Sequence, residues 1–251
     1  MACDSLEARP LAHDVAVRVI VLKHIAILGY AAMREGRRTA ALAQVRDACL
    51  DALAPYIASV TIDESLFLHS ENDISEESQW QMALGRVEYV QPLLWALGLI
   101  DSLPTYDVVA DLGDLLELNE LKEANFLPLA TLRPRAEINQ ARSIAEAWYW
   151  RRRSRELIEA GVKLPADRKL RKLGIYDRND LERWTARECL ADGTLNQVIE
   201  EDFPAFGKAY RDLAPEEWGV VGAITGARYY ALNWLCGWAP ENDWDRVPMG
   251  L

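Results

Sequence analysis

The sequence predicts an all-α protein that folds as a single compact helical domain of about seven or eight helices. Along most of the 251 residues, apolar side chains recur at the spacing of a helix face. Residues that start helices (Asp, Ser, Thr) and residues that stop them (Gly, Pro) punctuate this pattern. Alternating apolar and polar runs of the strand type never exceed about five residues. A chain of this length can bury a core without metal or disulfide staples.

The first two helices are expected at the N-terminus. One covers residues 12–33 and is ended by Gly36, and the other covers residues 39–54 and is ended by Pro55. Together they form an N-terminal helical pair within residues 1–58.

The stretch SVTIDESLFL, residues 59–68, is less regular. It predicts one short β element or a loop. Thr61 and Glu64 also have the spacing of a capping box, so a short helix is the alternative.

A clearer helix starts after Ser75, a good N-cap residue, and stops at Gly98. Pro92 lies inside its apolar pattern and is expected to kink it, because proline lacks the backbone N–H donor. An acidic stretch follows, in which residues 111–124 predict a short helix.

The second half of the chain is expected to contain four more helical segments. They cover residues 132–161, 177–193, 194–213 and 215–236. The third is expected to break at Pro204, and a loop rich in Lys and Arg is expected between the first two, over residues 161–176.

The final helix has an unusual composition. Gly219, Gly222 and Gly226 lie on nearly one side of it, although each glycine costs ~1 kcal/mol relative to alanine inside a helix. The spacing predicts that another backbone packs very close there. Trp234, near the end of this helix, is expected to seal it against the core; contact with a ligand is the alternative.

Charge is unevenly distributed along a chain whose net charge is −11. Residues 51–132 hold fifteen acidic and two basic side chains, whereas residues 133–187 hold fifteen basic and eight acidic ones. These blocks either pair across the fold, or one of them is a docking surface. Because the chain as a whole repels nucleic acid, nucleic acid is not expected as a partner.

The acidic block leads to the main functional hypothesis, a non-catalytic protein-binding module. Its specific form is an immunity protein that neutralises a bacterial toxin, because complementary charge would accelerate its encounter with a basic toxin domain. The predicted partner-binding residues are all acidic and lie within residues 101–123. They are Asp101, Asp107, Asp111, Asp114, Glu117, Glu120 and Glu123.

The stretch AWYWRRRSRE, residues 147–156, supports an alternative: a nucleotide- or RNA-binding protein or a small enzyme. On a helix, its aromatic and arginine side chains would share faces as stacked pairs, which bind single strands or phosphate. The candidate residues are Trp148, Trp150, Arg151, Arg152, Arg153 and Arg155. The structural interpretation is a solvated arginine face that meets the acidic stretch 101–123.

Catalytic signatures are absent from the sequence: there is no GxxxxGK phosphate loop, no GxSxG elbow and no HExxH motif. We therefore predict no catalytic residue, no cofactor and no metal, and favour binding over enzymatic activity. The stretch HSEND, residues 69–73, is interpreted as a polar loop rather than a metal site.

The compartment is predicted to be the cytoplasm. Cysteines at positions 3, 49, 189 and 236 are too far apart for a zinc knuckle or a redox pair, and are expected to be reduced thiols. The most apolar stretch is interrupted by Arg18, Lys23 and His24, which argues against a membrane span, and no membrane partner is expected.

Three stretches together resemble domain-of-unknown-function family 4272 of bacterial proteins. They are WQMALGRVEYVQPLLWALGLIDSLP (80–104), LRPRAEINQARSIAEAWYWRRR (132–153) and RYYALNWLCGWAPENDWDRVP (228–248). The resemblance covers most of residues 60–248 and implies a family-like core over residues 59–251 within one domain, 1–251. It implies no activity, cofactor or catalytic residue.

Overall fold

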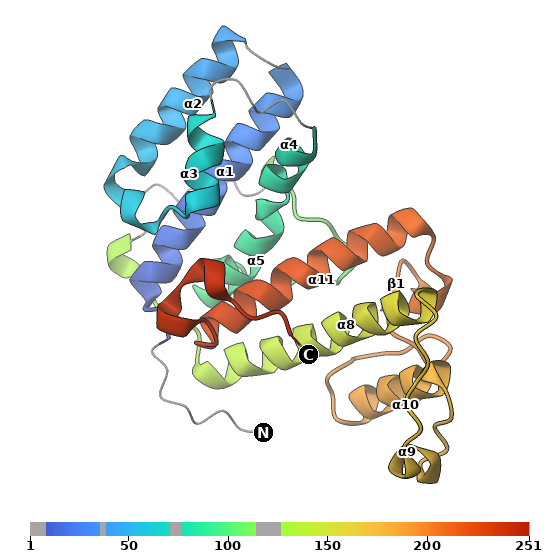
Figure 1. Cartoon of the computed structure of the whole chain (residues 1–251). Helices are drawn as coiled ribbons and strands as arrows, with labels where there is room; N and C mark the ends of the chain where they lie inside the picture. The colour runs from blue at the N-terminus through green and yellow to red at the C-terminus, as the bar shows by residue number, and fades with distance from the viewer. Residues whose placement is uncertain (1–8, 36–38, 71–76, 114–126, 251) are drawn as a thin grey trace. The chain divides into compact units, whose positions relative to one another are not determined.

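The computed structural model describes residues 9–35, 39–70, 77–113 and 127–250. Its regular elements are mostly helices, which confirms the all-α prediction (Figure 1). The α-helices are α1 (Ala12–Glu35), α2 (Ala40–Leu53), α3 (Ile62–His69), α4 (Glu77–Leu84), α5 (Arg86–Ala96), α8 (Arg135–Glu159), α9 (Arg168–Lys172), α10 (Arg178–Ala191) and α11 (Pro215–Leu235). The 3-10 helices are η1 (Ala54–Ser59), η3 (Leu127–Leu129), η4 (Tyr210–Asp212), η5 (Pro240–Asn242) and η6 (Trp244–Arg246). Strands β1 (Pro204–Ala205) and β2 (Lys208–Ala209) pair antiparallel.

The chain forms two compact units. Unit 1 comprises Met1–Leu103, Ala110–Arg135 and Tyr230–Pro248, and unit 2 comprises Pro104–Val109, Ala136–Tyr229 and Met249–Leu251. The last six residues of α11, from Tyr230, belong to unit 1 and the rest of that helix to unit 2. The division of a single domain into an N-terminal pair and a core from residue 59 stays a prediction.

Helix α1 forms the core of unit 1. It packs against α2, α3, α4 and α5 (Figure 1). Among the described residues it is the one helix long and apolar enough to cross a membrane, but 72 % of its apolar window is buried. Arg18 on α1 is also buried and pairs with the buried Glu64 of α3. Such burial and internal pairing are typical of a core helix rather than a lipid-facing one.

Helices α1 and α4 approach each other closely at Gly29. A Cβ atom placed at Gly29 would lie 2.8 Å from the Cβ of Ala83 and 2.9 Å from the backbone nitrogen of Leu84. Neither atom can move without shifting α4, so the contact requires glycine.

The short β element expected near residues 59–68 is wrong, because this stretch contains the end of η1 and the helix α3. Thr61 and Glu64 form the capping box: Thr61 Oγ1 accepts from the Glu64 backbone N–H at 3.3 Å, and the Glu64 carboxylate accepts from the Thr61 backbone N–H at 3.0 Å. This reciprocal pair satisfies two N–H groups at the start of α3 and so favours the helix.

The helix expected to kink at Pro92 is instead two helices that meet at Gly85. Helix α4 ends at Leu84 and α5 begins at Arg86, whereas α5 continues through Pro92. Glycine is a weak helix former, so the interruption falls at Gly85. The expected helix start at Ser75 and the stop at Gly36 lie outside the described residues.

Residues 194–213 were expected to be helical, and this prediction is wrong. The segment contains an isolated bridge between Ile199 and Asp202, then the β1–β2 hairpin and η4. Both two-residue loops have positive φ at their central positions: 48° and 61° at Glu200 and Glu201, and 52° and 69° at Phe206 and Gly207. Positive φ at both positions is the signature of type I′ hairpin turns and is incompatible with a right-handed helix.

The C-terminal tryptophans close the core of unit 1. Trp234 is 4 % exposed and Trp244 is 6 % exposed, and their ring centroids lie 5.1 Å apart. The indole Nε1 of Trp234 donates to the Asn242 carbonyl at 2.8 Å. Trp234 is therefore a core residue, as the sequence predicted. The helices α1, α2, α8, α10 and α11 agree with the predicted ones to within a few residues, whereas α9 lies in the expected loop.

We predict that Gly29→Ala lowers the free energy of unfolding by about 1–2 kcal/mol, because overpacking against α4 outweighs the better helix propensity of alanine. Gly219→Ala in α11 is the matched control, since no atom lies within 4 Å of a Cβ placed there. This change should raise stability by about 1 kcal/mol. Urea unfolding of both variants gives the comparison, and stabilisation by both would contradict the close α1–α4 contact.

We predict that Trp234→Ala lowers the free energy of unfolding by about 3–5 kcal/mol, because it removes buried apolar contacts and leaves a cavity. Met82→Ala on α4 of the same unit should change it by less than about 0.5 kcal/mol, because Met82 is 67 % exposed. Thermal melting and urea unfolding measure both variants. A Trp234→Ala protein of normal stability would show that the indole is not part of the core.

Candidate functional site

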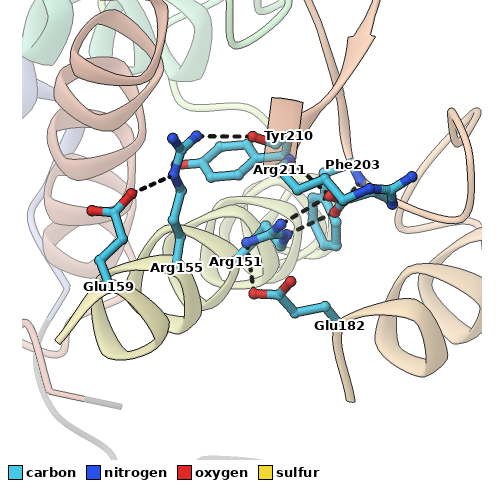
Figure 2. Close-up of polar contacts among 8 residues, drawn as sticks. Arg151, Arg155, Glu159, Glu182, Phe203, Tyr210 and Arg211 are labelled. Carbon is cyan, nitrogen blue, oxygen red and sulfur yellow. Dashed lines mark hydrogen bonds and ion pairs between the residues drawn. The ribbon is translucent and has the colours of Figure 1, made fainter. Parts of the chain in front are cut away.

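The arginine-rich stretch lies on α8, and its first arginine is buried in unit 2. Arg151 is 1 % exposed. Its Nε and Nη2 donate to the two carboxylate oxygens of Asp202 at 2.7 and 2.8 Å, and its Nη1 donates to Glu182 on α10 at 2.8 Å (Figure 2). Two parallel N–H···O bonds to one carboxylate are the strongest form of this pair. Arg151 therefore joins α8 to α10 and to the irregular segment after it.

Asp202 is fully used as an acceptor. Besides Arg151, its carboxylate accepts from the backbone N–H of Phe203 at 2.8 Å and from that of Arg211 at 2.9 Å. Its backbone also pairs with Ile199 across the turn of Glu200 and Glu201. One buried side chain thus fixes the turn before β1 and the chain after β2.

Glu182 has a perturbed pKa. Burial raises the pKa of this carboxyl, and the Arg151 guanidinium opposes the rise without cancelling it. Raised carboxyl pKa values occur in catalytic acids and also in structural ion networks. Because Glu182 is buried and holds Arg151, the network explains the shift without a substrate.

Arg152 extends from α8 to α11 in the same unit. Its Nη1 donates to the Gly222 carbonyl at 2.9 Å, and that nitrogen lies 3.0 Å from a Cβ placed at Gly226. No group from outside its own stretch of helix lies within 4 Å of a Cβ placed at Gly219. The prediction that a backbone packs on these glycines is therefore wrong: Gly222 and Gly226 make room for a guanidinium.

The remaining two arginines differ in exposure. Arg155 donates to the Tyr210 carbonyl at 3.0 Å and to Glu159 at 3.0 Å (Figure 2). It also donates to the Leu213 carbonyl at 3.2 Å. The Arg153 side chain is 56 % exposed and pairs with Glu156 on its own helix. Three of the four arginines therefore bind acceptors on other elements of unit 2.

The aromatic residues of the same stretch also pack internally. Trp148 is 4 % exposed and stacks on Tyr106 with ring centroids 4.5 Å apart. Tyr149 stacks on Tyr229 at 4.6 Å, and Trp150 is half-buried. These rings stack on other aromatic rings of unit 2, and one aromatic–arginine contact also forms on α8, where the Arg152 guanidinium lies 6.0 Å from the centroid of the Tyr149 ring.

The predicted acidic residues fall into two groups. Asp114, Glu117, Glu120 and Glu123 lie outside the described residues, as does most of the short helix expected over residues 111–124. Asp101 and Asp111 are exposed, and Asp107 is half-buried. Within the part of the chain that the structure describes, Asp101, Asp107 and Asp111 form no ion pair. The four arginines of residues 151–155 pair instead with Glu156, Glu159, Glu182 and Asp202.

Asp107 has a structural task. Its carboxylate accepts from the backbone N–H of Phe206, at the tip of the hairpin, at 2.6 Å. Burial would raise the pKa of Asp107, but hydrogen bonds from Thr105 and Phe206 outweigh it and lower the pKa. The stabilisation that this carboxylate gives is therefore present above the ordinary carboxyl pKa and is lost as pH falls through the lowered value.

The cysteines and histidines show no reactive arrangement among the described residues. Cys49, Cys189 and Cys236 are buried and form no disulfide within the described ranges, and burial raises the pKa of Cys49 and of Cys189 to about 11. Cys3 lies outside the described residues. In the four described ranges, no three His, Cys, Asp or Glu side chains are placed to hold a metal ion. Glu71 and Asp73 of the polar stretch lie outside those ranges.

Comparison with known proteins identified one family. The model of the family described as Domain of unknown function (DUF4272) matches residues 4–168. The match includes α1 and α2, ends at the start of α9, and contains the first two of the three resembling stretches. It differs in extent from the expected 60–248, because the third stretch, 228–248, lies beyond it. Neither the curated proteins nor the solved structures gave a match.

We predict that Arg151→Leu lowers the free energy of unfolding by about 3–5 kcal/mol, because it leaves Asp202 and Glu182 buried without a countercharge. Arg153→Leu, at the exposed position two residues along α8, should change it by less than about 0.5 kcal/mol. Urea unfolding measures both. Similar small effects of the two substitutions would mean that the Arg151 network does not hold unit 2 together.

Proposed function

The chain belongs to the family described as Domain of unknown function (DUF4272), and we propose that it is a non-catalytic protein-binding module of the cytoplasm. Its specific form in this proposal is an immunity protein, which neutralises a basic toxin domain through its acidic surface.

The observation that carries the proposal is that the arginines of residues 151–155 and the acids of residues 101–111 differ in what they contact. Arg151, Arg152 and Arg155 bind acceptors within unit 2. Asp101 and Asp111, by contrast, are exposed and form no ion pair in the described ranges. In a chain of net charge −11, this leaves a negative surface that attracts a basic partner from a distance.

Burial weighs against the alternative of a nucleotide- or RNA-binding protein. A ligand on residues 148–155 would need Trp148 and Arg151, which are 4 % and 1 % exposed. To reach them it would have to break the Tyr106 stack and the Asp202 pair. Arg153 is the exposed member of that set, with 56 % of its side chain accessible, and one exposed arginine makes a weak phosphate site.

The predicted acids are not equal candidates for docking. Asp107 already holds the hairpin tip, so changing it would disturb unit 2 as well as any interface. The docking role therefore falls to the other acids of the set, and the test of docking should leave Asp107 unchanged.

The first experiment addresses the partner. The products of genes next to this one are expressed in a bacterial host with and without the protein. The proposal expects one of them to arrest growth, relief of the arrest on co-expression, and co-purification of the two proteins as a complex. Neighbouring products that are all harmless, or a toxic one that the protein neither relieves nor binds, would contradict it.

We predict that Glu117→Lys, Glu120→Lys and Glu123→Lys together slow association with that toxin at least about tenfold at low salt and flatten its salt dependence, because they remove the attracting charge. Stopped-flow or surface-binding kinetics at several salt concentrations measure this.

The matched control is the triple Glu35→Lys, Asp47→Lys and Asp51→Lys. These acids are exposed on α1 and α2, and their reversal changes the net charge by the same amount. Equal slowing by both triples would show that only net charge matters. An unchanged rate in the first triple would place the interface elsewhere.

A further inference from the structure

The chain between α8 and α10 presents an unusual surface within unit 2. We define the basic loop as residues 162–176, which include α9. Its basic side chains are all exposed, and within the described ranges none of them forms an ion pair. They are Lys163, Arg168, Lys169, Arg171 and Lys172. The one acid of the loop, Asp167, caps α9 by accepting from the Lys169 backbone N–H at 2.6 Å.

Other exposed basic residues of the same unit do have acidic partners. Arg187 pairs with Glu201 at 3.8 Å, and Lys208 pairs with Glu217 at 2.7 Å. The basic loop therefore carries uncompensated positive charge, although the chain as a whole is acidic.

Exposed apolar side chains accompany this charge. Val162 is 44 % exposed, Leu173 is 55 % exposed and Tyr176 is 73 % exposed. Large apolar side chains that cluster on a surface mark an interaction site more often than single ones do. The loop thus combines positive charge with apolar groups in one short segment.

The backbone of the basic loop is fixed at both ends. The Arg178 Nε donates to the Val162 carbonyl at 2.5 Å, and the Tyr176 backbone N–H donates to Asp180 at 3.1 Å. Ile175, between the exposed Leu173 and Tyr176, is 2 % exposed and anchors the segment. Figure 1 shows α9 beyond α10 at one end of unit 2, so the loop protrudes from that unit.

We propose that the basic loop binds the surface of a membrane that contains anionic phospholipids. Lysine and arginine side chains pair with headgroup phosphates, and each contributes about a fivefold factor to binding. Leu173, Tyr176 and Val162 enter the boundary between headgroups and acyl chains, where burial of aliphatic and of aromatic side chains is favourable. The contact is peripheral, and no helix spans the bilayer in it.

The apolar side chains favour lipid over nucleic acid as the occupant. Single-stranded nucleic acid is held by bases that stack on aromatic rings. Two of the three exposed apolar residues of the loop are aliphatic and offer no such ring, whereas a lipid boundary accepts both kinds. The negative charge of the rest of the chain does not prevent this contact, because salt screens repulsion beyond about 8 Å.

The sequence predicts no membrane partner, because that prediction rests only on the lack of a membrane-spanning segment. The loop was recognised as rich in Lys and Arg, but its charge pattern does not reveal which apolar side chains are exposed. The exposure of Leu173 and Tyr176 is what the structure adds.

The test is co-sedimentation of the full chain with vesicles of phosphatidylglycerol and phosphatidylcholine in equal parts, compared with phosphatidylcholine alone. We expect binding to the anionic vesicles that weakens with salt, and none to the neutral ones. The triple Lys169→Gln, Arg171→Gln and Lys172→Gln should lower the partition coefficient about 100-fold, from three fivefold factors. Leu173→Ser with Tyr176→Ser should lower it about tenfold, with a loss that persists at high salt.

A matched control removes three basic charges elsewhere: Arg187→Gln, Lys208→Gln and Arg246→Gln. These side chains are 59 %, 47 % and 54 % exposed, and each faces an acid. The control should bind anionic vesicles within about twofold of the unaltered chain. Circular dichroism melting of all variants confirms that they are folded.

Several results would overturn the proposal. One is no binding to the anionic vesicles at low salt, and another is an equal loss in the control triple. Binding of single-stranded RNA or self-association through the loop, without vesicle binding, would assign the surface to another partner. Equal binding to both kinds of vesicle would remove the role of charge.

Discussion

The arrangement of unit 2 depends on the pairing of Arg151 with Asp202. Between α10 and α11 the chain makes two tight turns, and Glu200, Glu201 and Phe206 adopt positive φ in them, a conformation that costs roughly 1–3 kcal/mol for each such residue. The Asp202 carboxylate offsets this strain by binding Arg151 twice and two backbone N–H groups once each. Because the pair is buried, loss of Arg151 would leave the Asp202 carboxylate without a countercharge, and loss of Asp202 would leave Arg151 with Glu182 alone.

This constraint explains which parts of the fold the sequence could predict. The helices α1, α2, α8, α10 and α11 carry their own start and stop signals. Thr39 and Asp177, for example, cap α2 and α10, and Gly193, with φ of 81°, follows the end of α10. Residues 194–213 have no such local code. Their conformation depends on the contact of Asp202 with Arg151, which lies 51 residues earlier in the chain. Local sequence patterns do not contain this contact, and they wrongly predict a helix.

The same reasoning applies to the candidate site. The sequence singled out residues 147–156 because aromatic and arginine side chains adjoin there, and the structure shows that this stretch is indeed exceptional. The sequence could not show its role, because an arginine that binds phosphate and an arginine that binds a buried carboxylate look the same in a sequence. Likewise, the glycines of α11 signalled a close approach, but not that the approaching group is the side chain of Arg152. For the acidic set, only Asp101, Asp107 and Asp111 have a described position, and the docking role remains a proposal.

Our central claim is that Arg151 and Asp202 stabilise unit 2 as a pair, and a double-mutant cycle tests it most directly. The variants are Arg151→Met, Asp202→Asn and the two combined, with the free energy of unfolding measured for each in urea. We predict a coupling energy of about 2–3 kcal/mol, because Arg151→Met leaves the Asp202 carboxylate buried without its partner, and Asp202→Asn then removes that charge. Additivity within about 0.5 kcal/mol would show that the two residues act independently and would contradict this account.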